Sequence, residues 1–311
     1  MAIFVAADFD AREWAAWWPC LEAALPGERL VRERSDCRSD EIDIALVANP
    51  PHGALQGLRS LKLIQSLWAG VDKLLADATV PIDVPLARMV DPAMNTAMAE
   101  TVLWAVLSLQ RGFFGYAAQQ RAAQWQQQPL RRADDLSVAV LGLGQMGRAA
   151  ALTLAARGYR VVGWNTRETR IQGVQTQAGA AALPQVLAQA QIVVNLLPLT
   201  PATTGLFNAA TLAQMPRGAC LVNLARGAQV VDADLLAALA SGHIARAVLD
   251  VFQTEPLPAT HAFWSHPHVT VLPHVAAPTD PHSAARVVAG NVLALREARP
   301  LSHRVDRSKG Y

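Results

Sequence analysis

The sequence predicts an α/β protein made of two parallel-sheet domains. Short apolar runs alternate with longer Ala- and Leu-rich stretches of helical periodicity. The short runs are apolar on both faces, which is typical of strands in parallel sheets covered by helices on both sides. A chain of 311 residues is also longer than one core usually serves. The expected strands are residues 3–6, 42–48, 63–67, 84–89, 138–141, 160–164, 192–197, 219–224, 247–251 and 269–272.

Several longer stretches are expected to be helices, among them residues 94–116, 148–157 and 232–241. Thr200-Pro201 and Asp280-Pro281 each place a capping side chain before a proline at the first helical position. A helix is therefore expected to begin at each of these pairs. The strand and turn after the long helix begin a new unit. We accordingly predict a first domain of residues 1–97 and 281–311, interrupted by a second domain of residues 98–280.

Composition and charge exclude several classes of protein. Hydrophobic residues make up 52% of the chain, charged residues 17%, and the net charge is +2. Basic runs that would suit nucleic acid or a membrane surface are absent. The three cysteines form no CxxC pair, so a metal cage or a disulfide framework is not indicated. The N-terminus lacks the pattern of a signal peptide, and a cytoplasmic location is expected.

A glycine-rich motif lies at the middle of the chain, between an expected strand and an expected helix. It reads Gly142-Leu143-Gly144-Gln145-Met146-Gly147. The first glycine permits a tight turn, the second lets the backbone approach a pyrophosphate, and the third lets helix and strand pack closely. The helix N-terminus offers unpaired N–H groups to the phosphates. This context predicts a dinucleotide site.

The next expected strand ends at Asn165-Thr166-Arg167, where an NAD site usually carries Asp or Glu for the ribose 2′-hydroxyl. No acidic residue lies between Gly147 and Arg167. A carboxylate would repel the 2′-phosphate of NADP, whereas an arginine pairs with it. We therefore expect NADP(H) to be preferred, with NAD(H) possible. In the alternative, Arg167 and Arg170 are solvated loop residues and Glu168 takes the acidic role.

Four ordered motifs follow the glycine turn. They are residues 197–205 (LPLTPATTG), 221–227 (LVNLARG), 249–256 (LDVFQTEP) and 273–276 (PHVA). Together they resemble the D-2-hydroxyacid dehydrogenase family over nearly the whole chain. Residues 68–72 (WAGVD) and 305–311 (VDRSKGY) resemble its glyoxylate/hydroxypyruvate reductase A branch more closely. The resemblance implies a flavodoxin-like substrate domain and a Rossmann dinucleotide-binding domain, with an active-site cleft between them.

Arg226, Glu255 and His274 are the expected catalytic residues. A 2-oxo acid presents a carboxylate beside a ketone, and the planar guanidinium of Arg226 suits both groups. Hydride from the nicotinamide would attack the carbonyl carbon while His274 donates the proton as general acid. Glu255, if it meets the imidazole, would stabilise the charged form and orient the ring. Each residue alone has a structural explanation, but all three follow expected strand ends, where open α/β sheets bind ligands.

The remaining expected contacts fall into two groups. For the substrate they are Trp68, Ala69, Gly70, Val71 and Arg226. Backbone N–H groups at the turn that contains Gly70 are suited to a carboxylate. By resemblance, Asp250 belongs near the nicotinamide rather than in proton transfer. For the cofactor the expected residues are Gly142, Gly144, Gln145, Met146, Gly147, Asn165, Thr166, Arg167, Leu197, Pro198, Thr203, Leu224, Ala225, Asp250, His274 and Ala276. No metal is expected, because His261, His266 and His268 have no Cys or Glu partner at a suitable spacing.

Substrate and activity have alternatives. The reductase branch tends to carry an aromatic residue just before Pro-Pro in the first domain, but this chain has Ala48-Asn49-Pro50-Pro51. A small residue leaves room for a longer 2-oxo acid than glyoxylate or hydroxypyruvate. A 3-phosphoglycerate-type dehydrogenase and a dinucleotide-sensing corepressor are further alternatives, since such a binding protein can retain the Arg, Glu and His. The resemblance also implies a homodimer formed through the long helix and the segment after it.

Overall fold

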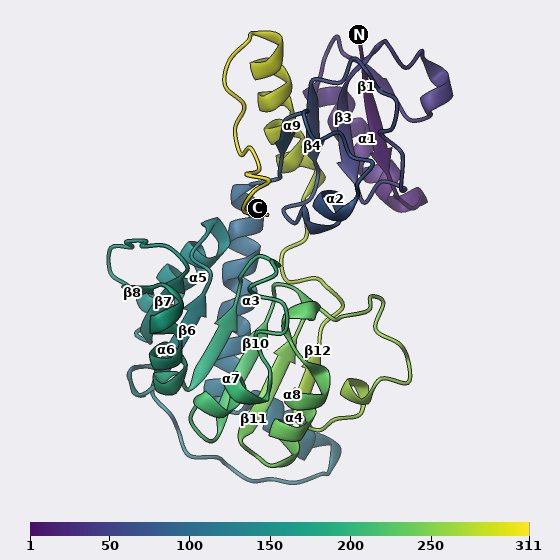
Figure 1. Cartoon of the computed structure of the whole chain (residues 1–311). Helices are drawn as coiled ribbons and strands as arrows, with labels where there is room; N and C mark the ends of the chain where they lie inside the picture. Colours follow the sequence, from purple (N-terminus) through teal and green to yellow (C-terminus); the bar gives the residue numbers. More distant parts are fainter. Residues whose placement is uncertain (311) are drawn as a thin grey trace. The chain divides into compact units, whose positions relative to one another are not determined.

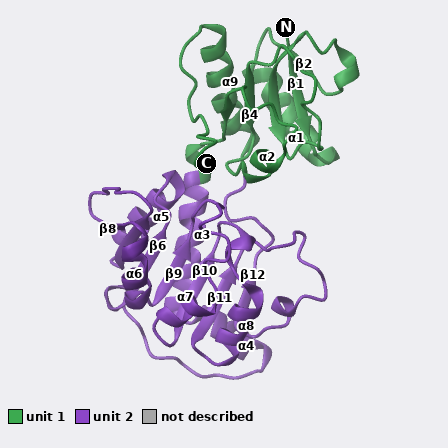
Figure 2. Cartoon of the chain, viewed as in Figure 1, with its two compact units in different colours: residues 1–94, 279–311 green, residues 95–278 purple. Residues whose placement is uncertain are grey.

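The computed structural model describes residues 1–310 and divides them into two compact units (Figure 2). Unit 1 comprises residues 1–94 and 279–310, and unit 2 comprises residues 95–278. The predicted domain boundaries lie at 97/98 and 280/281, close to these limits. Tyr311, the last residue of the predicted C-terminal motif, lies outside the described residues.

Unit 1 contains a five-stranded parallel sheet in the order β2-β1-β3-β4-β5 (Figure 1). This 2-1-3-4-5 order is that of flavodoxin-like folds. Its elements are β1 (Ala2–Ala7), α1 (Ala11–Ala24), β2 (Arg29–Val31), η1 (Arg34–Asp36), β3 (Ile42–Ala48), β4 (Leu63–Ser66), α2 (Asp72–Ala76), β5 (Leu86–Ala87) and α9 (Pro281–Arg296). The predicted α/β class is confirmed here, because every pair of neighbouring strands is parallel.

Helix α9 returns the chain to unit 1, as predicted. Asp280 caps it by accepting a hydrogen bond from the Ser283 N–H at 2.8 Å, and Pro281 occupies the first turn. Farther along α9, Arg296 pairs with Asp43, whose side chain is 1% exposed, and with Glu28 at 2.8 Å. The C-terminal helix is therefore tied to the sheet of the N-terminal segment by charge as well as by apolar packing.

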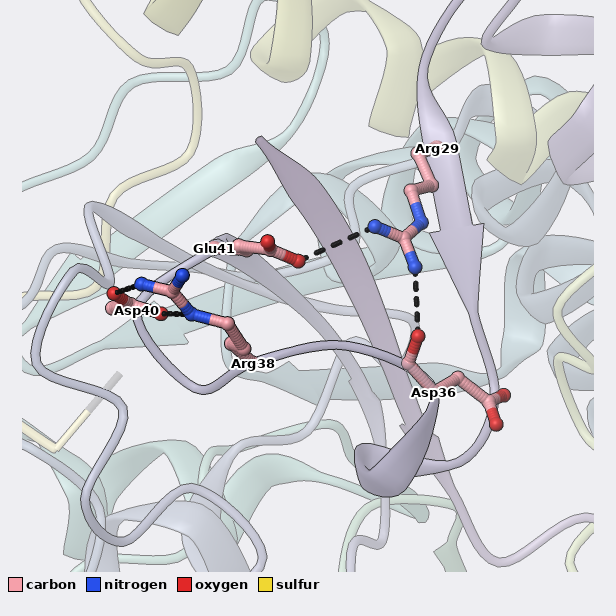
Figure 3. Close-up of polar contacts among 5 residues, drawn as sticks. All are labelled: Arg29, Asp36, Arg38, Asp40 and Glu41. Carbon is pink, nitrogen blue, oxygen red and sulfur yellow. Dashed lines mark hydrogen bonds and ion pairs between the residues drawn. The ribbon is translucent and has the colours of Figure 1, made fainter.

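A second group of charged residues stabilises the connection between β2 and β3 (Figure 3). Arg29 pairs with Glu41 at 3.3 Å and donates to the Asp36 carbonyl oxygen at 2.7 Å, while Arg38 pairs with Asp40. These side chains are largely exposed, so solvent screens both ion pairs and each contributes little to the stability of the fold. They shape a surface loop and are not part of the site described below.

Unit 2 contains a seven-stranded parallel sheet in the order β12-β11-β10-β9-β6-β7-β8. Counted from β6, this is the 3-2-1-4-5-6 order of a dinucleotide-binding fold with one further strand. Its elements are α3 (Pro92–Arg111), α4 (Phe113–Arg121), η2 (Ala133–Asp135), β6 (Ser137–Leu141), α5 (Gln145–Ala156), β7 (Arg160–Asn165), β8 (Gln175–Ala178), η3 (Ala180–Ala182), α6 (Leu183–Gln189), β9 (Ile192–Asn195), α7 (Ala209–Gln214), β10 (Ala219–Asn223), η4 (Gly227–Gln229), α8 (Asp232–Ala240), β11 (Ile244–Leu249), η5 (Ala262–Trp264) and β12 (Val269–Val271).

Both faces of the central strands β6, β9 and β10 of the unit 2 sheet are covered, which explains why these strands are mainly apolar. In β6, Val138 and Val140 pack in one cluster with residues of α3 and α5. The alternate residues Ala139 and Leu141 pack in a second cluster with residues of α6, α7 and α8. Alternation of side chains along a strand divides the core into these two layers.

Several predicted elements need correction. The predicted strand 84–89 is reduced to β5, and the short strands β2 and β8 were not predicted. The predicted long helix 94–116 is divided into α3 and α4 by Gly112, whose φ is 69°. No helix begins at Thr200-Pro201: residues 201–205 form turns, and α7 begins later with Asn208 as its cap. Thr203 and Thr204 both donate backbone N–H bonds to the Thr200 carbonyl oxygen at 3.0 Å, which closes a local turn instead.

None of the helices in residues 1–310 is both long enough and apolar enough to span a membrane.

Candidate active site

The glycine motif forms the turn between β6 and α5 as its residue types require. Gly142 has a φ of 93°, a conformation that side chains rarely adopt. A Cβ on Gly147 would lie 1.7 Å from the Gly142 carbonyl oxygen, so only glycine lets α5 begin this close to the strand. A Cβ on Gly144 would meet no atom within 4 Å. The turn therefore leaves the N-terminus of α5 available to an anionic group.

The end of β7 carries the residues expected to determine whether the site prefers NAD or NADP. Asn165 donates from Nδ2 to the Thr169 hydroxyl at 3.0 Å, which folds the loop back on itself. Arg167 is exposed. Glu168 pairs with Arg170 at 3.1 Å, and both side chains are largely exposed. The strand end thus presents an amide and an exposed arginine, while the nearest carboxylate already has a cationic partner.

Asp250 lies just after β11 and is 1% exposed. Its carboxylate accepts backbone N–H bonds from Val275 at 2.7 Å and Ala276 at 3.0 Å, and its carbonyl oxygen accepts the His274 N–H at 2.9 Å. Burial raises the pKa of Asp250, and the two N–H bonds oppose that change. Asp250 therefore shapes the loop that presents His274.

His274 and Glu255 come together although 19 residues separate them in sequence. The imidazole donates from Nδ1 to Glu255 Oε2 at 2.8 Å, and Glu255 Oε1 accepts the Phe252 N–H at 2.9 Å. The backbone of His274 has a φ of 55°, which is uncommon for a residue with a side chain. This arrangement leaves Nε2 as the ring nitrogen not committed to Glu255.

The two side chains of this pair change each other's acidity. The hydrogen bond to Glu255 raises the pKa of His274, although burial and the charge of Arg226 oppose it. For Glu255, burial favours the neutral form, but the bonds from His274 and Phe252 and the charges of His274 and Arg226 outweigh it and lower its pKa. The hydrogen bond therefore favours the charged forms of both partners, the imidazolium and the carboxylate.

Arg226 follows β10 and is partly exposed. Its Nη1 donates to the Ala225 carbonyl oxygen at 2.6 Å, and its charge acts on both His274 and Glu255. A Cβ on Gly227 would lie 1.8 Å from the Phe252 carbonyl carbon, so glycine lets the arginine loop pack directly on the loop that carries Glu255. Unit 2 thus brings all three predicted catalytic residues to neighbouring strand ends.

Other predicted cofactor residues lie on the loops after β9 and β10. Thr203 is 6% exposed and donates from its hydroxyl to the Pro198 carbonyl oxygen at 2.7 Å. Leu197, Leu224 and Ala225 are buried, as is Ala276 on the segment after β12. Sequence reasoning missed the buried amides Asn195, Asn223 and Gln229, although polar residues at the ends of apolar strands are a usable signal.

The predicted substrate residues 68–71 lie in unit 1, between β4 and α2. The Trp68 ring packs edge-on against Phe9 and Trp17, with centroid distances of 6.0 and 5.8 Å, and the backbone N–H of Trp68 donates to Ser66 Oγ at 3.0 Å. Their contact with substrate stays a prediction.

Across the described chain, Met1 to Gly310, no three His, Cys, Asp or Glu side chains gather in a way that could hold a metal ion. His261, one of the three histidines considered above, instead pairs with Asp232 at 3.3 Å.

Glu255→Gln should lower the pKa of His274, because the neutral amide no longer favours the charged imidazole. The measurement is an NMR titration of the His274 ring signals. Glu168→Gln, which removes an exposed carboxylate of the same unit, is the matched control and should leave the titration unchanged. An unaltered His274 titration in Glu255→Gln would contradict the assigned electrostatics.

Comparison with known proteins agrees with this geometry. Residues 103–276 match the family described as "D-isomer specific 2-hydroxyacid dehydrogenase, NAD binding domain". The chain is 40% identical to the glyoxylate/hydroxypyruvate reductase A of Serratia proteamaculans over 314 aligned positions, covering 99% of each protein. It is also 40% identical to the protein of that name from Klebsiella pneumoniae subsp. pneumoniae, again covering 99% of each.

Solved structures give the same result. A D-isomer specific 2-hydroxyacid dehydrogenase from Xanthobacter autotrophicus Py2, in complex with NADPH and MES, has a TM-score of 0.95 at 41% identity, covering 100% of this chain and 99% of that one. An NADPH-dependent glyoxylate/hydroxypyruvate reductase from Sinorhizobium meliloti, in complex with NADP and sulfate, has a TM-score of 0.93 at 35% identity, with the same coverage. The glycine turn, the His–Glu pair and these full-length similarities lead to one conclusion: the chain belongs to the D-isomer specific 2-hydroxyacid dehydrogenase family of NAD(P)-dependent oxidoreductases.

Proposed function

We propose that this enzyme reduces a small 2-oxo acid of the glyoxylate/hydroxypyruvate type to the 2-hydroxy acid, with NADPH as the preferred reductant. The observation that carries the proposal is the His274–Glu255 hydrogen bond of 2.8 Å, formed within the field of the Arg226 charge. A proton donor beside a cationic carboxylate-binding group is what reduction of a 2-oxo acid requires. The relatives described above support the substrate class and the cofactor.

Each residue has a separate task in this proposal. NADPH, when bound at the glycine turn, supplies a hydride to the carbonyl carbon of the substrate. Arg226 binds the substrate carboxylate and the adjacent carbonyl oxygen through its guanidinium. His274 donates its Nε2 proton to that oxygen as negative charge develops, so that the carbonyl group gains a hydride on carbon and a proton on oxygen and becomes an alcohol. Glu255 remains the acceptor of the Nδ1–H before and after the transfer.

The acidity of His274 sets the direction of the pH dependence. Reduction needs the protonated imidazole, and the bond to Glu255 raises the pKa of that group. Activity in the reductive direction is therefore expected to fall as the pH rises through the pKa of His274, and the bond to Glu255 moves this fall to higher pH.

Substitution of His274 tests the general-acid role. His274→Gln should lower kcat for NADPH oxidation with glyoxylate, hydroxypyruvate or a longer 2-oxo acid by about 100-fold or more, because the proton donor is lost. Glu255→Gln should shift the falling limb of the pH profile to lower pH. His268→Gln, an exposed histidine of the same unit, should leave both quantities unchanged.

The panel of acids also tests the reaction itself. Oxidation of NADPH with none of the acids would contradict the proposed reaction, and NADPH binding without turnover would favour a dinucleotide-sensing role. The acid with the highest kcat/KM decides between a glyoxylate-type substrate and a longer one. This comparison matters because Ala48-Asn49 occupies the place of the aromatic residue expected before Pro50-Pro51.

Arg167 is proposed to bind the 2′-phosphate of NADP. Arg167→Ala should lower the ratio of kcat/KM for NADPH to that for NADH by about tenfold, the usual scale for one charge-assisted contact with phosphate. Arg170→Ala is the matched control, because Arg170 pairs with Glu168 at 3.1 Å and is expected to have a smaller effect. Preference for NADH in the unaltered enzyme, or an unchanged ratio in Arg167→Ala, would contradict this assignment.

The enzyme is further proposed to form a homodimer through α3, α4 and residues 122–132. Large apolar side chains are exposed along this stretch, and exposed apolar surface of this kind marks interaction sites. Their exposed fractions are 41% for Trp104, 38% for Leu107, 47% for Phe113, 96% for Trp125 and 75% for Leu130.

Light scattering coupled to size-exclusion chromatography tests the dimer. The unaltered enzyme should elute with twice the mass of one chain. Trp125→Ser combined with Leu130→Ser should shift it toward the monomer, because both changes remove apolar contact area. Ile82→Ser, at a residue of unit 1 that is 69% exposed, is the control and should not alter the mass. A monomeric unaltered enzyme would contradict the proposal.

A cytoplasmic location is proposed on the chemistry of the cysteines. Cys20, Cys37 and Cys220 are all free thiols. Free thiols are typical of proteins that work in a reducing compartment.

A further inference from the structure

Three buried amide side chains meet directly below the active-site loops of unit 2. Asn195 ends β9, Asn223 ends β10 opposite it in the strand register, and Gln229 ends η4. All three are 0% exposed. Asn195 donates from Nδ2 to Asn223 Oδ1 at 2.9 Å and to Gln229 Oε1 at 2.7 Å. We call these three residues the amide triad.

The amide triad makes two sets of hydrogen bonds to the backbone, which we call its two arms. The first arm holds the N–H and the carbonyl group of Arg226. Asn223 Nδ2 donates to the Arg226 carbonyl oxygen at 3.0 Å, and Gln229 Oε1 accepts the Arg226 N–H at 3.2 Å. Asn223 Oδ1 also accepts the Ala225 N–H at 3.3 Å. The two peptide groups that flank the Arg226 side chain are therefore fixed by side chains that solvent does not reach.

The other arm holds the loop after β9. Gln229 Nε2 donates to the carbonyl oxygens of Leu197 and Pro198, both at 3.1 Å. Asn195 Oδ1 accepts the Leu197 N–H at 3.3 Å. Leu197 and Pro198 are predicted cofactor residues, so the amide triad connects the loop expected to contact the cofactor with the loop that carries the substrate arginine.

The residue types are the ones that this arrangement needs. Each triad member donates and accepts at the same time, and a neutral amide offers both functions in one side chain. A carboxylate can only accept when ionised, and an apolar side chain would leave buried peptide groups unpaired. Polar groups at fully buried positions cost stability unless all their bonds are formed, so a role beyond packing is indicated.

We propose that Asn195, Asn223 and Gln229 are positioning residues that set Arg226 for the substrate carboxylate through one arm and the 197–198 loop for the cofactor through the other. The inference rests on the proposed function of Arg226. None of the three is placed in contact with reacting atoms. Their effect is transmitted through the peptide groups they hold.

The two arms predict different effects of two near-isosteric substitutions. Oxalate serves as the probe of carboxylate binding at Arg226, because its binding is measured without turnover. Asn223→Asp loses the donor to the Arg226 carbonyl oxygen and should weaken oxalate binding to the enzyme–NADPH complex by about tenfold, and KM for glyoxylate should rise in parallel. The dissociation constant of NADPH should change by less than about twofold, because Asn223 has no hydrogen bond to residues 197–198. Gln229→Glu loses the donor to Leu197 and Pro198 and should weaken NADPH binding by about tenfold.

Asn291→Asp is the matched control. Asn291 is a 2% exposed amide of unit 1 that donates to Gln65 Oε1 at 2.7 Å. The same replacement of an amide by a carboxylate at Asn291 should lower the unfolding temperature without altering oxalate or NADPH binding. Equal losses of both ligands in Asn223→Asp and Gln229→Glu, or an effect of Asn291→Asp on binding as large as theirs, would overturn the proposal.

A double-mutant cycle tests whether Asn223 acts through Arg226. In an Arg226→Lys background, Asn223→Asp should change oxalate binding by less than about twofold, because the group it positions is already altered. Independent, multiplicative effects would overturn the inference. Oxalate binding is measured without turnover, so a wild-type enzyme that reduces no 2-oxo acid would contradict the proposed function separately from the positioning role.

Discussion

The parallel sheet of unit 2 is the constraint on which the candidate active site depends. In a parallel sheet the carboxyl ends of all strands lie at one edge, so residues far apart in the chain become neighbours there. The loops after β6, β9, β10 and β11 carry the glycine turn, the 197–198 segment, Arg226 and Asp250. β6 and β9 are adjacent although β7 and β8 lie between them in sequence, and this reversal of strand order is where such sheets bind dinucleotides.

Close backbone packing fixes the positions of the loops at the carboxyl edge of this sheet. Gly147 lets α5 begin against the Gly142 carbonyl group, and Gly227 lets the Arg226 loop rest on Phe252. Both contacts would be blocked by a single Cβ atom. Since these segments touch through their backbones, the positions of the side chains that they carry are closely defined.

Buried polar groups then act on the charged ones through the backbone. Asp250 uses both carboxylate oxygens to hold the peptide groups after His274, and the amide triad holds the peptide groups around Arg226. Glu255 accepts a hydrogen bond from the imidazole directly, and this bond raises the pKa of His274. The site is therefore organised by polar side chains of two kinds, one that fixes loops and one that fixes charge.

The sequence by itself determined the fold class, the glycine turn and the identity of the three candidate catalytic residues. Apolar runs, glycine spacing and four ordered motifs are local properties that can be read along the chain. It did not reveal β2 and β8, which are short and only partly buried, or the turn that replaces a helix at Thr200-Pro201.

Only the tertiary structure decided which groups meet. The His274–Glu255 bond and the amide triad join residues that lie on different loops and strands. Asn195 and Gln229 lie 34 residues apart and carry no motif that links them. Their pairing depends on the register of β9 with β10 and on the path of the loop after it, and these are set by packing across the whole sheet rather than by any local pattern of residues.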